Sequence, residues 1–256
     1  MDEVKPDIRL SLVIPCYNES ARLPLLAAGL EDFIRRWPLQ PEIILVNDGS
    51  TDKTFELLNA RFSGLAGAQV HILTQANTGK GGALRTGVLQ TTGDWVLTLD
   101  ADMASPPTEV LNWLRDNGGR LEQNTIYIGS REHPESVIKK EGDRKVAGNI
   151  FNGIVRLLTP LRLRDTQCGF KLYPGPAARL LLAPLQTMGW AHDVEILYRA
   201  QRHGLVLRAM PLTWTAVDGS KINLLRDAVR MLAEVLRIAG LVRREPINPQ
   251  LLSAIQ

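Results

Sequence analysis

Two aspartates that follow an apolar run are the residues of this chain best suited to chemistry. The run covers residues 95–99, and Asp100 and Asp102 come directly after it. Its alternating apolar side chains predict a buried strand, so both carboxylates are expected where that strand leaves the core. Two carboxylates at this spacing can hold Mg²⁺ or Mn²⁺, with water and a diphosphate in the remaining coordination positions. The alternative is a charged turn that binds no ion.

Two other turns carry side chains that suit a nucleoside. Asp48 follows the apolar run 42–47, where its carboxylate could accept hydrogen bonds from a base or a ribose, and Gly49 permits a tight turn into a helix. Tyr17 and Glu19 follow the run 8–16 and place an aromatic ring and a carboxylate at the same edge. Without a ligand, both segments are ordinary strand-to-helix turns with polar caps.

A glycine-rich segment at residues 77–82 resembles a loop that cradles phosphate. Lys80 and the backbone N–H groups around it would lie at the start of a helix, which attracts anions. The segment is not the loop of a P-loop NTPase, because Gly81 stands where Ser or Thr is required. It is not a dinucleotide-binding fingerprint either, because Leu84 stands in place of the third glycine.

Strand and helix patterns alternate through the first half of the chain. The predicted strands cover residues 8–16, 42–47, 69–73, 94–99 and 125–130. The predicted helices cover residues 20–37, 51–62, 79–90 and 106–116. This order predicts an α/β fold with a mostly parallel central sheet and helices on both faces. Since ligands bind at the carboxyl ends of such strands, Glu19, Asp48, Asp100, Asp102 and Arg131 are expected at one edge.

The alternation weakens after residue 131. We predict a mobile polar loop over residues 132–145, a turn-rich segment over 164–174, and a strand or strand pair over 205–217. Amphipathic helices are predicted over residues 145–158, 175–183, 190–203 and 222–243. No linker divides the sequence, so we predict one domain over residues 1–256 with an N-terminal half, 1–131, and a C-terminal half, 132–256.

The composition is ordinary for a globular protein. The chain has 256 residues, of which 45% are hydrophobic and 22% charged. No run of about 18 apolar residues occurs, so no membrane-spanning helix is expected. The polar N-terminal segment does not resemble a signal peptide. Cys16 and Cys168 form no CxxC motif, which favours a reducing compartment and buried thiols.

Charge is distributed unevenly between the two halves. Residues 1–130 hold 11 Lys and Arg against 16 Asp and Glu, a net charge of −5, whereas residues 131–256 hold 19 against 11, a net charge of +8. The basic half could meet phosphates, a lipid headgroup surface or nucleic acid, or it could present solvated helix faces. Interleaved exposed aromatic residues are lacking, which argues against nucleic acid.

The last predicted helix carries a row of arginines. At 100° per residue, four side chains fall within about 40° of one another: Arg226, Arg230, Arg237 and Arg244. An apolar stripe that includes Leu232, Val235 and Leu236 faces the other way. The row could face anionic lipid headgroups, or it could be the solvated side of a helix packed on the core.

The order of these motifs resembles that of a known family. The chain carries, in sequence, Pro-x-Tyr-Asn-Glu at 15–19, Asn-Asp-Gly-Ser-x-Asp at 47–52, Asn-x-Gly-Lys-Gly at 77–81, Asp-Ala-Asp at 100–102, Gly-Ser-Arg at 129–131, Asp-Thr-Gln-Cys-Gly-Phe-Lys at 165–171, Trp-Ala-His-Asp-Val-Glu at 190–195 and Gly-Ser-Lys at 219–221. Over residues 10–225 it is similar to the inverting nucleotide-sugar glycosyltransferases of family 2. Within these it resembles the dolichyl- or polyprenyl-phosphate glucosyl- and mannosyltransferases, nearest to the glucosyl branch. The resemblance implies a GT-A fold.

The resemblance also implies roles for individual residues. The nucleoside pocket would be lined by Pro15, Tyr17, Glu19 and Asp48. The donor would be contacted by Asp100, Ala101 and Asp102, and Asp102 would be the main ligand of Mg²⁺ or Mn²⁺. Phosphates of donor or acceptor would be bound by Arg131 and Lys221, and the lipid phosphate by Arg144 or Lys145. The sugar site would be shaped by Asp165, Gln167, Asp193 and Glu195.

Two positions depart from the family pattern. Ala104 stands where mannosyl members carry a glutamine that adds a metal ligand, so fewer protein groups would hold the ion. His192 stands where an aromatic residue is expected, and we interpret it as a hydrogen-bonded histidine on a helix face.

The implied reaction transfers a hexose, glucose before mannose, from UDP-glucose or GDP-mannose to polyprenyl phosphate, with inversion. A phosphate acceptor is already ionised near neutral pH and needs no general base. The enzyme is then expected to act peripherally on the cytoplasmic face of a membrane. One alternative is a sugar hydroxyl acceptor, for which Asp193 would be the base. Another is a non-catalytic nucleotide-binding module.

Overall fold

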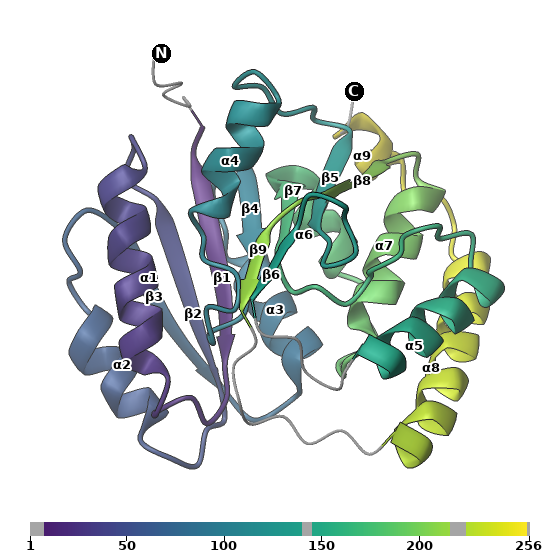
Figure 1. Ribbon diagram of the computed structural model, residues 1–256, viewed down its shortest axis with the longest axis horizontal. Coiled ribbons are helices and arrows are strands. Elements are labelled where there is room, and N and C mark those ends of the chain that lie inside the picture. The colour runs from purple at the N-terminus through teal and green to yellow at the C-terminus, as the bar shows by residue number, and fades with distance from the viewer. Residues whose placement is uncertain (1–7, 140–144, 216–223, 255–256) are drawn as a thin grey trace.

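Within residues 8–139, 145–215 and 224–254, which the computed structural model describes, a seven-stranded sheet forms the centre of the molecule (Figure 1). Its strands lie in the order β3-β2-β1-β4-β7-β5-β8. They are β1 (Leu10–Cys16), β2 (Glu42–Asp48), β3 (Gln69–Gln75), β4 (Trp95–Thr98), β5 (Thr125–Gly129), β7 (Lys171–Pro174) and β8 (Val206–Met210). All five strands predicted for the first half are present, so the predicted α/β fold is confirmed.

The middle of the sheet is parallel and buried on both faces. β1 pairs in parallel with β2 on one side and with β4 on the other, and β2 pairs in parallel with β3. Every residue of β2 and β4 is buried, as expected for strands that helices cover on both sides. Because β1, β2 and β4 run the same way, the turns that follow them meet at one edge of the sheet.

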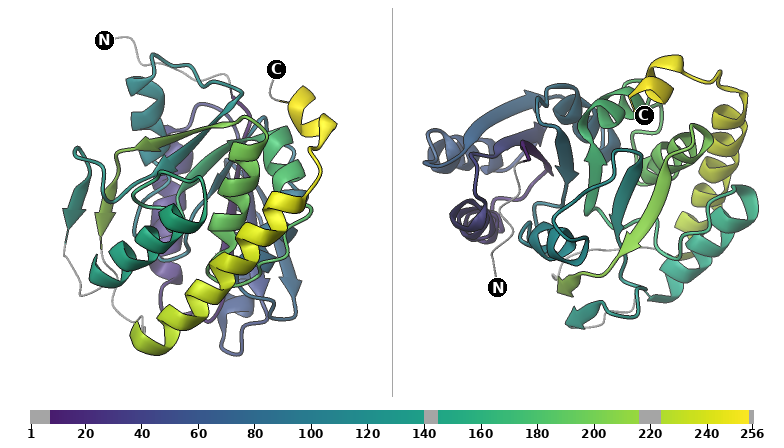
Figure 2. Two further views of the ribbon diagram at one scale, coloured as in Figure 1. Left: turned by 90° about the vertical axis from the view of Figure 1, so that its right-hand side faces the viewer. Right: turned by 90° about the horizontal axis from the view of Figure 1, so that it is seen from above.

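Helices cover the two faces of the sheet in separate groups (Figure 2). One face packs against α1 (Leu23–Arg36), α2 (Thr54–Phe62) and α4 (Glu109–Asp116). The other face packs against α3 (Lys80–Leu89), α5 (Lys145–Leu158), α6 (Gly175–Leu182), α7 (His192–Arg202), α8 (Leu224–Arg244) and α9 (Pro249–Ser253). The strand β1 shows the alternation: Leu12 and Ile14 enter the first core, and Val13 enters the second.

β7 is a strand that the sequence analysis assigned to a turn-rich segment. It lies between β4 and β5 and is antiparallel to both. Lys171, its first residue, is fully buried, and a charged residue at such a position breaks the apolar pattern from which a central strand is predicted. The buried ammonium is paired with the carboxylate of Asp193 at 2.7 Å, which makes this strand possible.

Part of the predicted loop 132–145 is a strand. Residues Val137–Lys139 form a strand, β6, which pairs in parallel with β9 (Thr213–Thr215) in a small separate sheet. The pairing joins segments about 75 residues apart, and short polar stretches give no local signal of such a contact. The predicted strand pair at residues 205–217 is confirmed as β8 and β9, which belong to different sheets.

α8 is packed on the core along part of its length. It lies against α5 and α7, and Figure 2 (left) shows it running along the outside of the second helix group. Val235, Ile238 and Val242 are buried, whereas Leu232 and Leu236 of the predicted apolar stripe are exposed. Of the described members of the predicted stripe, only Val235 is therefore packed on the core. No helix among the described residues combines the length and the apolar character that crossing a bilayer requires.

Candidate active site

Asn18 ties together the turns that follow β1 and β2. Its backbone has a positive φ of 53°, and its side-chain oxygen accepts hydrogen bonds from the N–H groups of Thr51 and Asp52 at 2.8 and 3.3 Å. The N–H of Asn18 donates in turn to Ser50. Asparagine tolerates this left-handed backbone better than most residues, so this sequence can close the site edge with a tight corner.

Asp48 accepts hydrogen bonds from its own chain. The residue is buried, and its two oxygens accept hydrogen bonds from the N–H groups of Thr78 and Gly79 at 2.9 Å each and from the side chain of Gln75 at 2.7 Å. The carboxylate thus shapes the loop that leads into α3. A direct contact between Asp48 and a base stays a prediction.

Lys80 reaches the carboxylates that follow β4. Gly79 before it has a φ of 92°, and a Cβ there would lie 2.7 Å from the carbonyl oxygen of Met188, so only glycine fits. Nζ of Lys80 lies 2.5 Å from Oδ1 of Asp100. Burial works against the charge of Lys80, but the carboxylates of Asp100 and Asp193 outweigh it and raise the pKa of the ammonium. Lys80 therefore stays positive beside the aspartate pair, as predicted for a phosphate-binding lysine.

Asp100 and Asp102 differ in environment. The side chain of Asp100 is 40% exposed, and Gly169 lies so close that a Cβ there would collide with its carboxylate. Asp102 is partly buried, and its Oδ1 accepts a hydrogen bond from the N–H of Ala104 at 3.0 Å. Burial raises the pKa of Asp102, and the negative charge of Asp100 adds to this rise. A cation between the two carboxylates would relieve that repulsion.

Arg131 and Asp165 form one unit at the far side of the pocket. The guanidinium makes two parallel bonds, from Nε to Oδ2 at 2.8 Å and from Nη2 to Oδ1 at 2.9 Å, and the backbone N–H of Arg131 adds a third at 3.0 Å. Asp165 is buried, which works against its charge, but Arg131 outweighs the burial and lowers the pKa of Asp165. Asp165 therefore positions Arg131, and its role in shaping a sugar site stays a prediction.

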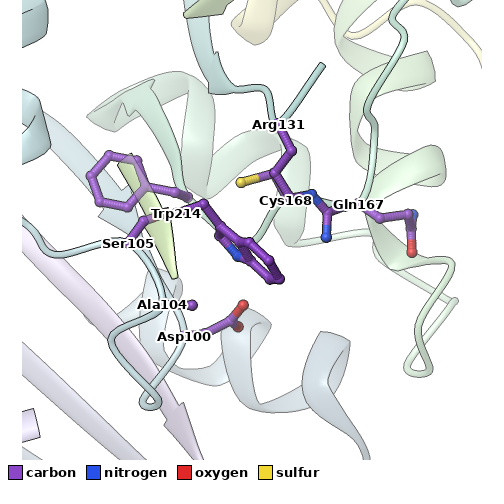
Figure 3. Close-up of a pocket in the computed structure, with 9 residues that line it drawn as sticks. Asp100, Ala104, Ser105, Arg131, Gln167, Cys168 and Trp214 are labelled. Carbon is purple, nitrogen blue, oxygen red and sulfur yellow. The ribbon is translucent and has the colours of Figure 1, made fainter. Parts of the chain in front are cut away.

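Asp100 and Arg131 line a pocket with an empty volume of about 310 Å³ that opens to solvent. Figure 3 shows Asp100 at one end and Arg131 at the other, with the indole ring of Trp214 between them in this view. The predicted residue Gln167 also lines it, as does Ala104, which stands in place of the family's glutamine. The remaining wall is formed by Ser105, Cys168, Gly169 and Phe170.

Asp193 lies under the site and does not line this pocket. Its carboxylate is buried and receives a hydrogen bond from Nζ of Lys171 at 2.7 Å. Burial opposes the charge, but the positive groups around it outweigh burial and lower the pKa of Asp193. Burial also lowers the pKa of His192, so its imidazole is neutral near pH 7 and Lys171 is the main counter-ion. The structure does not place Asp193 as a freely accessible base.

The prediction of a hydrogen-bonded histidine holds for only one of the two ring nitrogens of His192. Nδ1 lies 2.8 Å from the carbonyl oxygen of Gly189. Nε2 is buried, makes no hydrogen bond among the described residues, and lies 3.5 Å from Oδ1 of Asp193.

Glu195, predicted to shape the sugar site, is fully buried and accepts bonds from the N–H groups of Gln186 and Thr187. It supports the loop before α7.

The remaining predicted residues lie at the edge or outside the described chain. Tyr17 is 47% exposed, Pro15 is half-buried at the end of β1, and Ala101 is buried between the two aspartates. Glu19 is bonded to Arg22 through both oxygens, while burial raises its pKa. Arg144 and Lys221 lie outside the described residues.

The donor set at the aspartates suits a hard divalent cation. Asp100 and Asp102 offer carboxylate oxygens only, which is the ligand type that Mg²⁺ and Mn²⁺ prefer. Among the described residues, no cluster of three or more His, Cys, Asp or Glu side chains could hold a metal ion. Two carboxylates leave most coordination positions to water and ligand oxygens, so the residues fit an ion that binds together with a diphosphate.

Two tryptophans of the site were not found from the sequence. Arg131 lies over the ring of Trp214, with its central carbon 5.7 Å from the ring centroid, and Lys80 lies over Trp190 with Nζ at 5.8 Å. Each cation beside Asp100 thus has an aromatic partner. Trp190 is the first residue of the Trp-Ala-His-Asp-Val-Glu motif. Trp214 lies between two threonines in a short strand, and a large aromatic residue in such a polar segment is the feature that could have indicated a role in the site.

Comparison with known proteins agrees with this arrangement. The model of the family described as Glycosyl transferase family 2 matches residues 11–170. The chain is 33% identical over 91% of its length to the Dolichyl-phosphate beta-glucosyltransferase of Dictyostelium discoideum, of which it covers 74%. It is 35% identical over 92% of its length to the Saccharomyces cerevisiae enzyme of that name and covers 76% of it. It is 35% identical over 85% of its length to the Homo sapiens enzyme of that name and covers 70% of it.

Solved structures share the fold. Glucosyl-3-phosphoglycerate synthase from Mycobacterium tuberculosis, in complex with Mn²⁺, UDP-glucose and phosphoglyceric acid, superimposes with a TM-score of 0.67 at 20% identity, covering 93% of this chain and 82% of that one. Mannosyl-3-phosphoglycerate synthase from Rubrobacter xylanophilus superimposes with a TM-score of 0.68 at 17% identity, covering 94% of this chain and 78% of that one. The predicted GT-A fold is confirmed. The family match begins in β1 and ends at Phe170 in the wall of the pocket, so it spans most of the described site. The chain therefore belongs to glycosyl transferase family 2.

Proposed function

We propose that this chain is an inverting hexosyltransferase that moves glucose, or failing that mannose, from a nucleotide sugar to dolichyl or polyprenyl phosphate. The dolichyl-phosphate beta-glucosyltransferases support this reaction, because they are 33–35% identical over most of the chain. The solved neighbour with UDP-glucose supports a UDP-linked donor over a GDP-linked one.

The donor would bind along the edge formed by the turns after β1, β2 and β4. Tyr17 and Glu19 stand where the nucleoside is expected, and Lys80 and Arg131 stand on two sides of Asp100, where a diphosphate would need positive charge. The hexose would then occupy the pocket beside Trp214 and Gln167. The chain's own contribution is to fix the donor and to balance the charge of the departing diphosphate.

Asp100 and Asp102 would hold the divalent cation, Mg²⁺ or Mn²⁺. The solved neighbours crystallised with Mn²⁺ support this assignment. When bound, the ion supplies Lewis-acid stabilisation of the leaving diphosphate. Lys80 already neutralises Asp100, so its ammonium is placed to move from the carboxylate to a phosphate oxygen when the donor arrives.

The observation that carries the choice of acceptor is the pairing of Asp193 with Lys171. A sugar hydroxyl must lose its proton, and the base considered for that step is buried, ion-paired and held at a low pKa. A prenyl phosphate needs no such base. Its anionic oxygen can attack the anomeric carbon directly, opposite the departing diphosphate, which inverts the configuration.

The acceptor would approach from the second half of the chain. We propose residues 1–131 as the donor half and residues 132–256, with net positive charge, as the acceptor half of one domain. Arg243 and Arg244 are exposed at the end of α8 and favour an anionic membrane surface. Action at the cytoplasmic face of a membrane agrees with this arrangement.

An acceptor comparison tests the proposal. The purified chain is given UDP-glucose and Mn²⁺ with either a prenyl phosphate or the matching prenyl alcohol, and glucosylated lipid is counted. We expect product only with the phosphate, loss of turnover in Asp102→Asn, and turnover within about tenfold of the parent in Asp193→Asn, since no proton needs a base. Thermal unfolding checks that Asp193→Asn is folded. Product from the alcohol, lost in a folded Asp193→Asn, would support the hydroxyl-acceptor alternative.

A further inference from the structure

Trp190 presents a large apolar surface to solvent beside the site. Its side chain is 74% exposed, more than that of any other aromatic residue in the described parts of the chain. The other tryptophans are buried or half-buried. An indole left in water at a site edge forgoes the favourable burial of its surface, which a ligand could supply.

The loop that carries Trp190, residues 184–191, is held firmly. Thr187 N–H donates to the buried Glu195 at 2.8 Å, and Arg237 of α8 donates to the Thr187 hydroxyl at 2.6 Å. The carbonyl of Met188 accepts a bond from the N–H of Gly81 at 2.8 Å. The exposure of Trp190 is therefore a feature of an anchored loop that joins α3, α7 and α8.

The indole borders the charged centre of the site but is not part of the pocket wall. Nζ of Lys80 lies 5.8 Å from the Trp190 ring centroid and 2.5 Å from Asp100. Asp100 and Trp214 both line the pocket, whereas Trp190 is not part of its wall. A ligand portion that meets Trp190 is thus distinct from one bound beside Trp214.

A cation next to an open apolar face suits a ligand whose anionic head is attached directly to hydrocarbon. A prenyl phosphate has this form, because its first carbon follows the phosphate ester oxygen. A hexose would be better covered in the pocket beside Trp214, where Gln167 offers a polar side chain. An indole open to solvent leaves room for a chain to continue outward.

We propose that Trp190 is the platform for the first isoprene units of the acceptor and that Lys80 lies within reach of its phosphate. The inference rests on the proposed prenyl-phosphate acceptor. It assigns a specificity-determining role to a residue outside the donor pocket: Trp190 selects a phosphate that bears a hydrocarbon chain over a bare phosphate.

Steady-state kinetics of the full chain test this role. With geranyl phosphate as acceptor, Trp190→Ala is expected to raise the acceptor KM about tenfold, while Trp190→Phe stays within about threefold and the donor KM is unchanged. Leu25→Ala, which trims a 53% exposed leucine on α1, serves as the control and should change neither KM. A rise in the donor KM alone would place the indole on the donor, and no change in either KM would also overturn the proposal.

A binding measurement separates this inference from the proposed function. Geranyl phosphate should shift the tryptophan emission of the parent chain to shorter wavelength, inorganic phosphate should not, and Trp190→Phe should abolish the shift. If the parent shows the shift but transfers no hexose, the proposed function fails and the platform stands. If no shift occurs, or if it survives in Trp190→Phe, the platform is wrong whatever the turnover.

Discussion

Nζ of Lys80 lies 2.5 Å from Oδ1 of Asp100, so the first residue of α3 neutralises one of the two carboxylates that follow β4. The ammonium and a bound cation would compete for the same oxygen. Lys80→Met is therefore expected to bind Mn²⁺ alone several-fold more tightly and to bind UDP about tenfold more weakly, because the diphosphate loses a positive partner. Calorimetric titration of each ligand measures both effects.

The matched control is Lys53→Met, which removes an exposed lysine at the start of α2. It should leave both titrations as they are in the parent chain. If Lys80→Met weakened Mn²⁺ and UDP equally, the ion pair with Asp100 would be supporting the aspartates and not competing with the ion.

Arg131 and Asp165 are predicted to act as one unit, since three hydrogen bonds join them. Arg131→Lys loses the paired geometry, and Asp165→Asn loses the charge that orients the guanidinium, so each should lower kcat/KM about 10- to 100-fold. The double variant should be little worse than either single variant. Additive losses in this cycle would mean that the two side chains contribute separately.

The raised pKa of Asp102 is expected to set the acid limit of activity. Burial and the charge of Asp100 favour the protonated form, so Asp102 takes up a proton at a higher pH than an ordinary aspartate. Ion binding and turnover should therefore fall as the pH is lowered toward that raised pKa. Because Mn²⁺ competes with the proton, a higher Mn²⁺ concentration should move the midpoint of the kcat/KM profile to lower pH. A midpoint that does not respond to Mn²⁺ would assign the limit to another group.

The buried pair of Lys171 and Asp193 makes a prediction about stability. Lys171→Met leaves the Asp193 carboxylate buried without its partner and should lower the free energy of unfolding by about 3–5 kcal/mol. Adding Asp193→Asn removes the stranded charge and should recover most of that loss. Urea unfolding of the two variants and the parent gives these values. Equal destabilisation by both variants would show that packing, and not the charge, is at stake.

The sequence predicted the first half of the fold better than the second. Strands such as β2 carry continuous apolar runs between polar turns, and these local patterns predicted Asp100 and Arg131 at one edge of the sheet, where both line the pocket. The strand β7 was not predicted, because Lys171 occupies a buried position and its partner Asp193 lies on a helix 22 residues away. Contacts between distant segments leave no mark on local periodicity.

The same limit applies to the hydrogen bonds within the site. Asp48 and Asp193 are acidic residues in motifs, and the sequence alone does not tell whether a carboxylate faces a ligand or its own chain. Asp48 is bonded to the backbone that follows β3, and Asp193 is bonded to a strand. Trp190 and Trp214 enter the site only because the fold brings their loop and strand beside Lys80 and Arg131.

The most direct test is the configuration of the sugar in the product. The chain is incubated with UDP-glucose, Mn²⁺ and a prenyl phosphate, and the coupling of the anomeric proton is read by NMR. We expect a glucose joined to the prenyl phosphate in the β configuration, inverted from the α-linked donor, with release of UDP. An α-linked product, or no consumption of any sugar nucleotide in the presence of prenyl phosphate, would contradict it.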